Sequence, residues 1–191
     1  MGQLIFIILT LLSFGFFAYT GYKIISYFKL TKSSPYPFFN KLDKRIYHTL
    51  AVAFGQTKIL KKPVAGLLHA LVYWGFLVIT VGTVEMIIDG VSGTERCLGS
   101  LGWAYSAVTI SGEVFAALII ICCFIFLVRR YIIKPKRFTA PEMKPSSRMD
   151  ATFILSMILL LMFSLIGMNT GYISKGGEIN GIFPVSGLFA D

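Results

Sequence analysis

The sequence has few of the residues from which metal centres are usually built. Its 191 residues include two histidines and three cysteines, and the cysteines are Cys97, Cys122 and Cys123. No two cysteines have the C-x-x-C spacing that zinc and iron–sulfur sites commonly use. The cysteines therefore provide no zinc or iron–sulfur ligand set. Because Cys122 and Cys123 lie within an apolar run, we expect them to act as small packing residues.

Acidic residues are also scarce: 9 Asp and Glu stand against 18 Lys and Arg, and the net charge is +9. A basic chain can indicate nucleic-acid binding, but here eight of the cations lie in residues 29–62 and seven in residues 129–148. Lys and Arg collect in the cytoplasmic loops of membrane proteins. We therefore expect no nucleic-acid partner, and we expect both basic segments to face the cytoplasm. The N-terminus and residues 90–101 and 171–191 would then lie outside.

Long apolar runs are the main feature that is present. The chain is 55% apolar, with a mean hydropathy of +0.75. Four runs reach the roughly 20 residues that a membrane helix needs: Leu4–Phe28, Val64–Ile88, Trp103–Val128 and Ala151–Met168. The first run has no positive charge before it and no A-x-A-like site after it, so we do not expect it to be a cleaved signal peptide. The predicted fold is all-α and integral to the membrane, a bundle of four transmembrane helices. These helices fall within residues 1–30, 63–90, 102–128 and 151–170.

A further, amphipathic helix is predicted in the basic cytoplasmic segment 31–62. One stripe is apolar and consists of Phe39, Leu42, Ile46, Leu50 and Ala53 or Phe54. Lys41, Lys44 and His48 fall on the other side, as in helices that lie in the headgroup layer of a bilayer. The second basic segment, 129–150, is predicted to be a loop. Residues 171–191 form an outer loop whose apolar end is typical of the start of a further helix, which suggests the front part of a longer helical domain.

Ionisable side chains inside a membrane are candidates for function because their burial is costly. His69 has three interpretations: an axial ligand of haem b, a hydrogen-bond donor to a quinone, or a packing residue. The only other histidine, His48, is predicted to be solvated, so the chain cannot pair two histidines around a haem within the membrane. The candidates for a sixth ligand are Met86, Met157, Met162 and Met168.

Two carboxylates also fall in predicted membrane helices. Glu113 is a candidate proton carrier or a partner for a polar group on a neighbouring helix. Glu85 lies near a helix end, where an interfacial carboxylate can reach water. Counted inward from the helix ends at 1.5 Å per residue, His69 and Glu113 lie at depths that differ by only about 5 Å.

Two stretches of the sequence resemble a known family. They are GQTKILKKPVAGLLHALVYWGFLVITVGTVEMIIDGVSGTER, and GEVFAALIIICCFIFLVRRYIIKPKRFTAPEMK with the following RMDATFILSMILLLMF. Both are similar to the membrane domain at the front of Bacteroidetes-type (Fe-S)-binding oxidoreductases related to the heterodisulfide reductases. The resemblance covers roughly residues 45–170. It implies a helical bundle of the nitrate-reductase gamma-subunit type in a bacterial inner membrane.

The resemblance implies electron transfer between a membrane quinone, such as menaquinone, and cytoplasmic [4Fe-4S] centres. The cysteine motifs of those centres are absent here, so the clusters would belong to a missing C-terminal part or to a partner chain that docks on the basic face. His69 is the candidate haem or quinone ligand, and the chain by itself is not a complete enzyme. The alternatives are a cofactor-free membrane anchor of a larger complex and, with thin support from Gly82 and Gly112, a small transporter.

Overall fold

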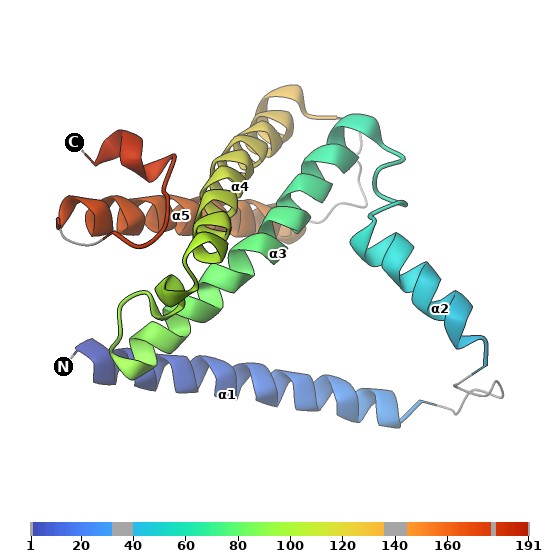
Figure 1. The fold of residues 1–191 in the computed structure, drawn as a ribbon. Helices are drawn as coiled ribbons and strands as arrows, with labels where there is room; N and C mark the ends of the chain where they lie inside the picture. Colours follow the sequence, from blue (N-terminus) through green and yellow to red (C-terminus); the bar gives the residue numbers. More distant parts are fainter. Residues whose placement is uncertain (1, 32–39, 136–144, 177–178, 191) are drawn as a thin grey trace. The chain divides into compact units, whose positions relative to one another are not determined.

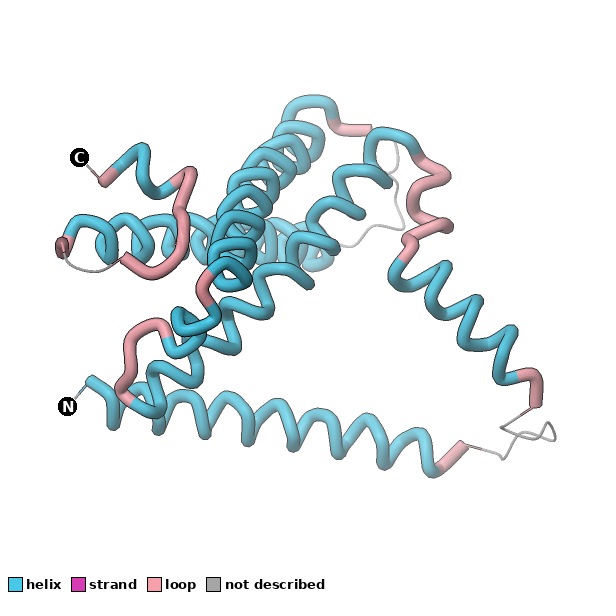
Figure 2. The backbone as a smooth tube through the Cα atoms, viewed as in Figure 1, coloured by secondary structure: helices cyan, strands magenta, loops and turns pink. Residues whose placement is uncertain are grey.

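The computed structural model describes residues 2–31, 40–135, 145–176 and 179–190, although not the side chains of 145–148. All regular structure in these residues is helical, which confirms the predicted all-α fold (Figure 1). The α-helices are α1 (Gly2–Lys29), α2 (Leu42–Thr49), α3 (Pro63–Ser92), α4 (Trp103–Val128) and α5 (Pro145–Ser174). Short 3-10 or π-helical turns are η1 (Leu50–Phe54), η2 (Cys97–Leu101), η3 (Arg129–Ile133) and η5 (Ser186–Phe189). Figure 2 shows these helices in cyan and the described loops and turns between them in pink.

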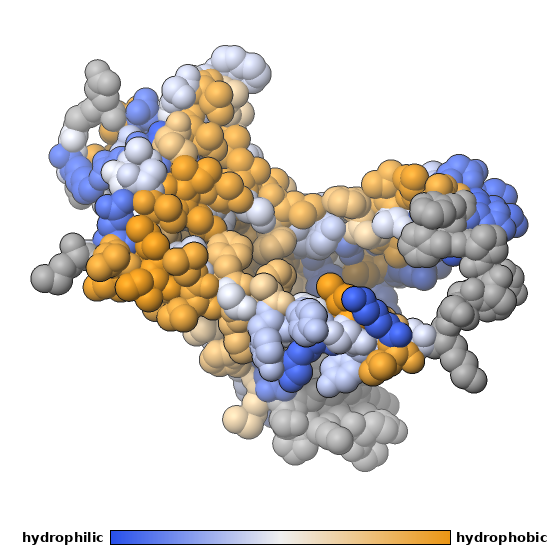
Figure 3. All heavy atoms as spheres, turned by 90° about the horizontal axis from the view of Figure 1, so that it is seen from below, coloured by the Kyte–Doolittle hydropathy of each residue, from blue (hydrophilic) through white to orange (hydrophobic). Residues whose placement is uncertain are grey.

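Four helices in the described part of the chain are long and apolar enough to cross a membrane, and they correspond to the four predicted runs. They lie within Gly2–Lys29, Pro63–Ser92, Trp103–Ile133 and Met149–Ser174. Their outward-facing side chains are largely apolar: Leu12, Phe17 and Leu161, for example, are each more than 60% exposed. Figure 3 shows such hydrophobic side chains gathered on the surface of the helices. A surface of this kind is stable in lipid rather than in water.

The chain divides into two compact units, of which the first contains residues 1–58 and 86–95. Within it, α1 meets the last part of α3. The Gln3 side-chain amide donates a hydrogen bond to the Val91 carbonyl at 2.8 Å, and the Phe6 ring lies against Gly90, where a Cβ would collide with it. Glycine at position 90 thus permits the close approach of an aromatic ring.

The predicted amphipathic helix forms in the same unit as α2 continued by the π-helical turn η1. Leu42, Ile46 and Leu50 recur every four residues and are exposed, as expected of an apolar stripe without a protein partner within the unit. Phe39, the first member of the predicted stripe, lies outside the described residues. His48 is exposed, as predicted.

The second unit contains residues 59–85 and 96–191, and α4 supplies most of its buried side chains. Buried residues recur every three or four positions along α4: Tyr105, Thr109, Glu113, Ala116, Ile119, Cys122 and Cys123. This spacing forms one face of a helix, and α4 packs along α5. Cys122 and Cys123 are 2% and 0% exposed, consistent with a packing role.

The approach of α3 to α4 within this unit depends on a glycine. A Cβ placed on Gly75 would lie 2.8 Å from Ile119 Cδ1 and 3.1 Å from Phe115 Cδ1. Small residues at a helix contact let backbones come close in membranes, where apolar burial alone gives little association energy. After α5, residues 179–190 return along that helix and end in the turn η5. This segment supplies ligands to the polar cluster described below.

Candidate functional site

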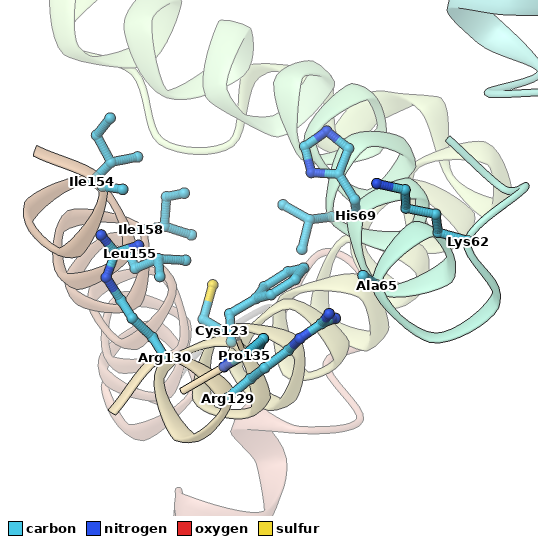
Figure 4. A pocket seen from close by; sticks show the side chains of 13 residues that line it. Lys62, Ala65, His69, Cys123, Arg129, Arg130, Pro135, Ile154, Leu155 and Ile158 are labelled. Atoms are coloured by element: carbon cyan, nitrogen blue, oxygen red, sulfur yellow. The ribbon is translucent and has the colours of Figure 1, made fainter. Parts of the chain in front are cut away.

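A cavity of about 440 Å³ opens in the second unit, at the end of the helices that carries Lys62, Arg129 and Arg130 (Figure 4). We call it the basic cavity. Its remaining lining residues come from α3, α4, the loop after η3, and α5: Ala65, His69, Val72, Cys123, Phe126, Pro135, Ala151, Ile154, Leu155 and Ile158. The volume is within the range of small-molecule sites in proteins.

Helical periodicity explains why these residues share one cavity. Ala65, His69 and Val72 are four and three residues apart, so they lie on one face of α3. Cys123 and Phe126 have the same relationship on α4, as do Ala151, Ile154 and Ile158 on α5. Pro63 opens α3, where a missing backbone N–H costs nothing. His69 therefore lies on the second turn of its helix, facing α4 and α5.

His69 faces this cavity with its imidazole exposed and with no hydrogen bond to any of the described residues. Figure 4 shows the ring, the Cys123 sulfur and the Arg129 and Arg130 side chains arranged around one space. No Asp or Glu is among the described residues that line it. The cavity therefore combines an imidazole with three cationic side chains and an apolar wall.

The donor set of the cavity can be compared with what a haem requires. Among the described lining residues His69 is the one imidazole, and none of Met86, Met157, Met162 or Met168 lines the cavity. Membrane b-type haems take two axial ligands, commonly histidines on facing helices. The described residues thus supply one axial ligand and do not fit a complete six-coordinate haem site.

A second polar region, the buried polar cluster, is centred on Glu113, which is 1% exposed. Asn169 Nδ2 donates to Glu113 Oε1 at 3.0 Å, and the Ser186 hydroxyl donates to the same oxygen. The backbone N–H groups of Val185 and Ser186 donate to Oε2 at 2.7 and 3.0 Å. Four donors thus converge on the two oxygens of one carboxylate.

Arg96 extends the buried polar cluster toward Glu85. Its guanidinium donates to Asn169 Oδ1 at 2.7 Å and to the Tyr105 hydroxyl at 3.3 Å. Tyr105 in turn donates to Glu85 Oε2 at 3.2 Å, and Glu85 Oε1 accepts the Leu98 N–H at 3.1 Å. Glu85 is only 3% exposed. It is therefore a buried, hydrogen-bonded carboxylate rather than the water-facing one expected from the sequence.

Aromatic rings enclose the Arg96 guanidinium. Its central carbon lies 4.6 Å from the centre of the Tyr172 ring and 5.1 Å from that of Phe183, distances typical of cation–π contacts. The Phe183 ring belongs to the returning segment, and Ile182 next to it donates its N–H to Thr109 Oγ1 at 3.1 Å. Helices α3, α4 and α5, the α3–α4 connection and residues 182–186 thus meet around these few polar groups.

The structure separates the two candidate residues that the sequence placed at similar depths. Cys123 lines the basic cavity beside His69, whereas Glu113 lies ten residues earlier on the same helix. At 1.5 Å per residue this is about 15 Å along the axis of α4, so Glu113 lies outside the basic cavity that His69 lines.

Three members of the buried polar cluster are absent from the sequence-based candidates: Arg96, Asn169 and Ser186. Asn169 ends an apolar run, and Arg96 is a single cation in a short connection, so each resembles an ordinary boundary residue. Ser186 belongs to a tail that carries no helical period. Only the return of that tail onto α4 and α5 brings it to Glu113.

The sequence is similar to two curated proteins that are named as oxidoreductases. It is 30% identical over 133 residues to the "Probable iron-sulfur-binding oxidoreductase FadF" of Bacillus subtilis (strain 168), covering 70% of this chain and 18% of that protein. It is 27% identical over 140 residues to the "EtfAB:quinone oxidoreductase" of Syntrophomonas wolfei subsp. wolfei, covering 73% of this chain and 18% of that protein.

The chain thus spans about a fifth of the length of these curated relatives. No family model matches it, and no solved structure matches it. Both relatives are named as oxidoreductases.

Proposed function

We propose that the chain is the membrane module of an electron-transfer oxidoreductase, and that it exchanges electrons between a membrane quinone and iron–sulfur centres outside this segment. The observation that carries the proposal is the basic cavity, in which His69 faces apolar helix surfaces near one end of the membrane-spanning segments. The names of the two relatives, one iron–sulfur-binding and one quinone-linked, support the same chemistry.

The residues of the cavity suit a quinone. The imidazole of His69 can donate one hydrogen bond to a quinone carbonyl oxygen, and the nearby arginines stabilise negative charge that develops on that oxygen. Ile154, Leu155 and Ile158 form an apolar wall for the ring and tail. In the reducing direction the quinone takes two electrons from the iron–sulfur centres and two protons from water, giving the quinol. The oxidising direction is the reverse.

Haem b was the other candidate for His69. A haem held here would pass single electrons, with His69 as a ligand of its iron and the Arg129 charge near its propionates. Because the described residues provide no second axial ligand, we derive no step through a haem. A quinone needs no second ligand, so it is the occupant that this donor set supports better.

For Glu113 we propose a structural role rather than proton transfer. Its four donors hold both carboxylate oxygens, and the path from it toward Glu85 passes through Arg96. An arginine remains protonated in proteins and cannot relay a proton by losing its own. Glu113 is also about 15 Å along α4 from Cys123, which lines the basic cavity. These features favour a polar partner that joins helices.

The basic segments have a proposed role as the docking face for a soluble iron–sulfur module. Lys and Arg placed on one side of a membrane favour a cytoplasmic orientation, and a cationic surface attracts an acidic partner. The block RFTAPEMK, which contributes to the family resemblance, lies outside the described residues. We propose a bacterial inner-membrane location with the basic cavity on the cytoplasmic side.

The proposal is tested by quinone binding to the purified chain in detergent, followed as quenching of tryptophan fluorescence by menadione. We expect His69→Ala to raise the dissociation constant at least about tenfold, as loss of a buried polar contact does. His48→Ala is the matched control, because His48 is the second histidine of the chain and lies outside the cavity. Equal affinity in both variants would contradict the proposal and leave the cofactor-free anchor as the better interpretation.

A reduced-minus-oxidised optical spectrum of the same preparations distinguishes the haem interpretation. A b-type band that is lost in His69→Ala and retained in His48→Ala would assign His69 to a haem whose second ligand comes from elsewhere. Quinone binding without such a band is the result that we expect.

A further inference from the structure

We propose that the cationic rim of the basic cavity is a binding site for the phosphate of an anionic phospholipid. The rim consists of Lys62, Arg129 and Arg130. This site shares the two arginines and the apolar wall of α5 with the site proposed for the quinone. The inference does not rest on the quinone proposal, because it does not involve His69 and its test measures lipid binding.

Burial separates the rim from the deeper part of the cavity. Cys123 is 0% exposed, Arg129 and Arg130 are half-buried, and Lys62 is exposed. Arg129 follows Cys123 by six residues, which is about 9 Å along the helix. The cations therefore lie at the ends of the membrane-spanning segments, at the level where phospholipid headgroups meet the hydrocarbon.

The positive charge of the rim favours a negatively charged ligand. Three cationic side chains from two different segments line one opening, and no acidic residue is among the described residues that line it. The N-terminus of α3 opens at the same place, since Pro63 follows Lys62 directly and Ala65 lines the cavity. A helix N-terminus also favours negative charge. Basic pockets between membrane helices bind anionic lipid headgroups by this combination of charges.

The apolar wall opposite the rim favours a ligand that carries acyl chains as well as an anionic group over a free anion. Ala151, Ile154, Leu155 and Ile158 form a continuous apolar face of α5, and Ile154 is 56% exposed. Figure 4 shows this face across the cavity from Lys62. A free phosphate would leave the wall uncovered, whereas the acyl chains of a lipid bury it. Phosphatidylglycerol has both features, a single negative phosphate and two acyl chains.

The test is native mass spectrometry of the delipidated full chain, titrated with phosphatidylglycerol, phosphatidylcholine or inorganic phosphate. The variant is the triple substitution Lys62→Gln, Arg129→Gln and Arg130→Gln. Its matched control removes three exposed cations that do not line the cavity, Lys58→Gln, Lys61→Gln and Lys134→Gln. A second variant, Lys62→Arg with Arg129→Lys and Arg130→Lys, keeps the charge. Circular dichroism and gel filtration identify any variant that fails to fold.

We expect the chain to bind phosphatidylglycerol at least about tenfold more tightly than phosphatidylcholine, and the triple glutamine variant to lose that preference. The control and the charge-keeping variant should retain it. Equal binding by the triple variant and its control would overturn the proposal. So would equal affinity for the two lipids. Displacement of phosphatidylglycerol by equimolar inorganic phosphate would show a free-anion site instead, and would also overturn it. If the glutamine variant does not fold, the comparison of the two lipids and the charge-keeping variant still test the proposal.

Discussion

Asn169 on α5 donates its side-chain amide to the Glu113 carboxylate on α4, with Nδ2 and Oε1 3.0 Å apart. Both side chains are buried, at 4% and 1% exposure. The Oδ1 atom of the same Asn169 side chain accepts a hydrogen bond from the Arg96 guanidinium at 2.7 Å. One amide thus joins a carboxylate to a guanidinium where water cannot replace either contact. The cluster should therefore contribute strongly to the stability of the second unit.

Replacing Glu113 with Ala should destabilise the chain by about 3 kcal/mol, because its four donors lose their buried acceptor. Glu113→Gln should destabilise the chain less than Glu113→Ala, because the amide oxygen still accepts hydrogen bonds. Some loss of stability should remain, because the amide nitrogen would face other hydrogen-bond donors. Thermal unfolding in detergent, followed by tryptophan fluorescence, measures both. Asp150→Asn, at an exposed position on α5, is the control and should change the melting temperature little. A Glu113→Ala protein as stable as the control would contradict the structural role proposed for Glu113.

Asn169→Leu should lower the free energy of unfolding by about 1–3 kcal/mol, since the substitution leaves partners of the amide unsatisfied. Its effect should not add to that of Glu113→Gln. A double-mutant cycle in the same unfolding assay should give a coupling energy of about 1 kcal/mol or more, as for residues in one network. Strict additivity would mean that the two side chains do not interact.

Gly75→Val should weaken the contact between α3 and α4, because a Cβ there meets Ile119 and Phe115. Gly82→Val on the same helix is the matched control, since a Cβ at Gly82 meets nothing within 4 Å. The two substitutions change helix propensity equally, so their difference isolates packing. We expect Gly75→Val to be less stable than Gly82→Val by about 1–3 kcal/mol. Ile119→Ala should partly restore it.

Gly66→Ala should disturb the approach of residues 59–62 to the start of α3. A Cβ at position 66 would collide with the Ile59 carbonyl, which is backbone and cannot turn aside as a side chain can. We expect a loss of about 1–3 kcal/mol. Gly167→Ala, whose Cβ has open space, should be neutral or stabilising by up to about 1 kcal/mol. Equal melting temperatures for the two variants would argue against this contact.

Gly66 also explains part of the sequence motif on which the family resemblance rests. In the pattern P-x-A-G-x-x-H, Pro63 begins α3, Gly66 admits the Ile59 backbone, and His69 faces the basic cavity. Gln56 of the preceding G-Q-x-K has a positive φ of 51° and is 5% exposed. Pro63, Gly66 and Gln56 thus contribute to the local backbone geometry, and His69 belongs to the candidate site.

The sequence by itself determined the membrane class, the four long helices and the amphipathic helix. Hydrophobic run length and helical period are local properties, because every backbone group in a bilayer must be paired within its own segment. The position of His69 on a helix near a basic end was likewise evident from Pro63 and the lysines before it.

Only the tertiary structure decided which polar groups meet. Helix register depends on close contacts such as that of Gly75 with Ile119, and counting residues from the helix ends could not reveal it. It likewise could not reveal that His69 faces the basic cavity whereas Glu113 belongs to the buried polar cluster. The return of residues 182–186 onto Glu113 pairs groups more than 70 residues apart. No local pattern encodes such a pairing, since it is the burial of the carboxylate between helices that requires those donors.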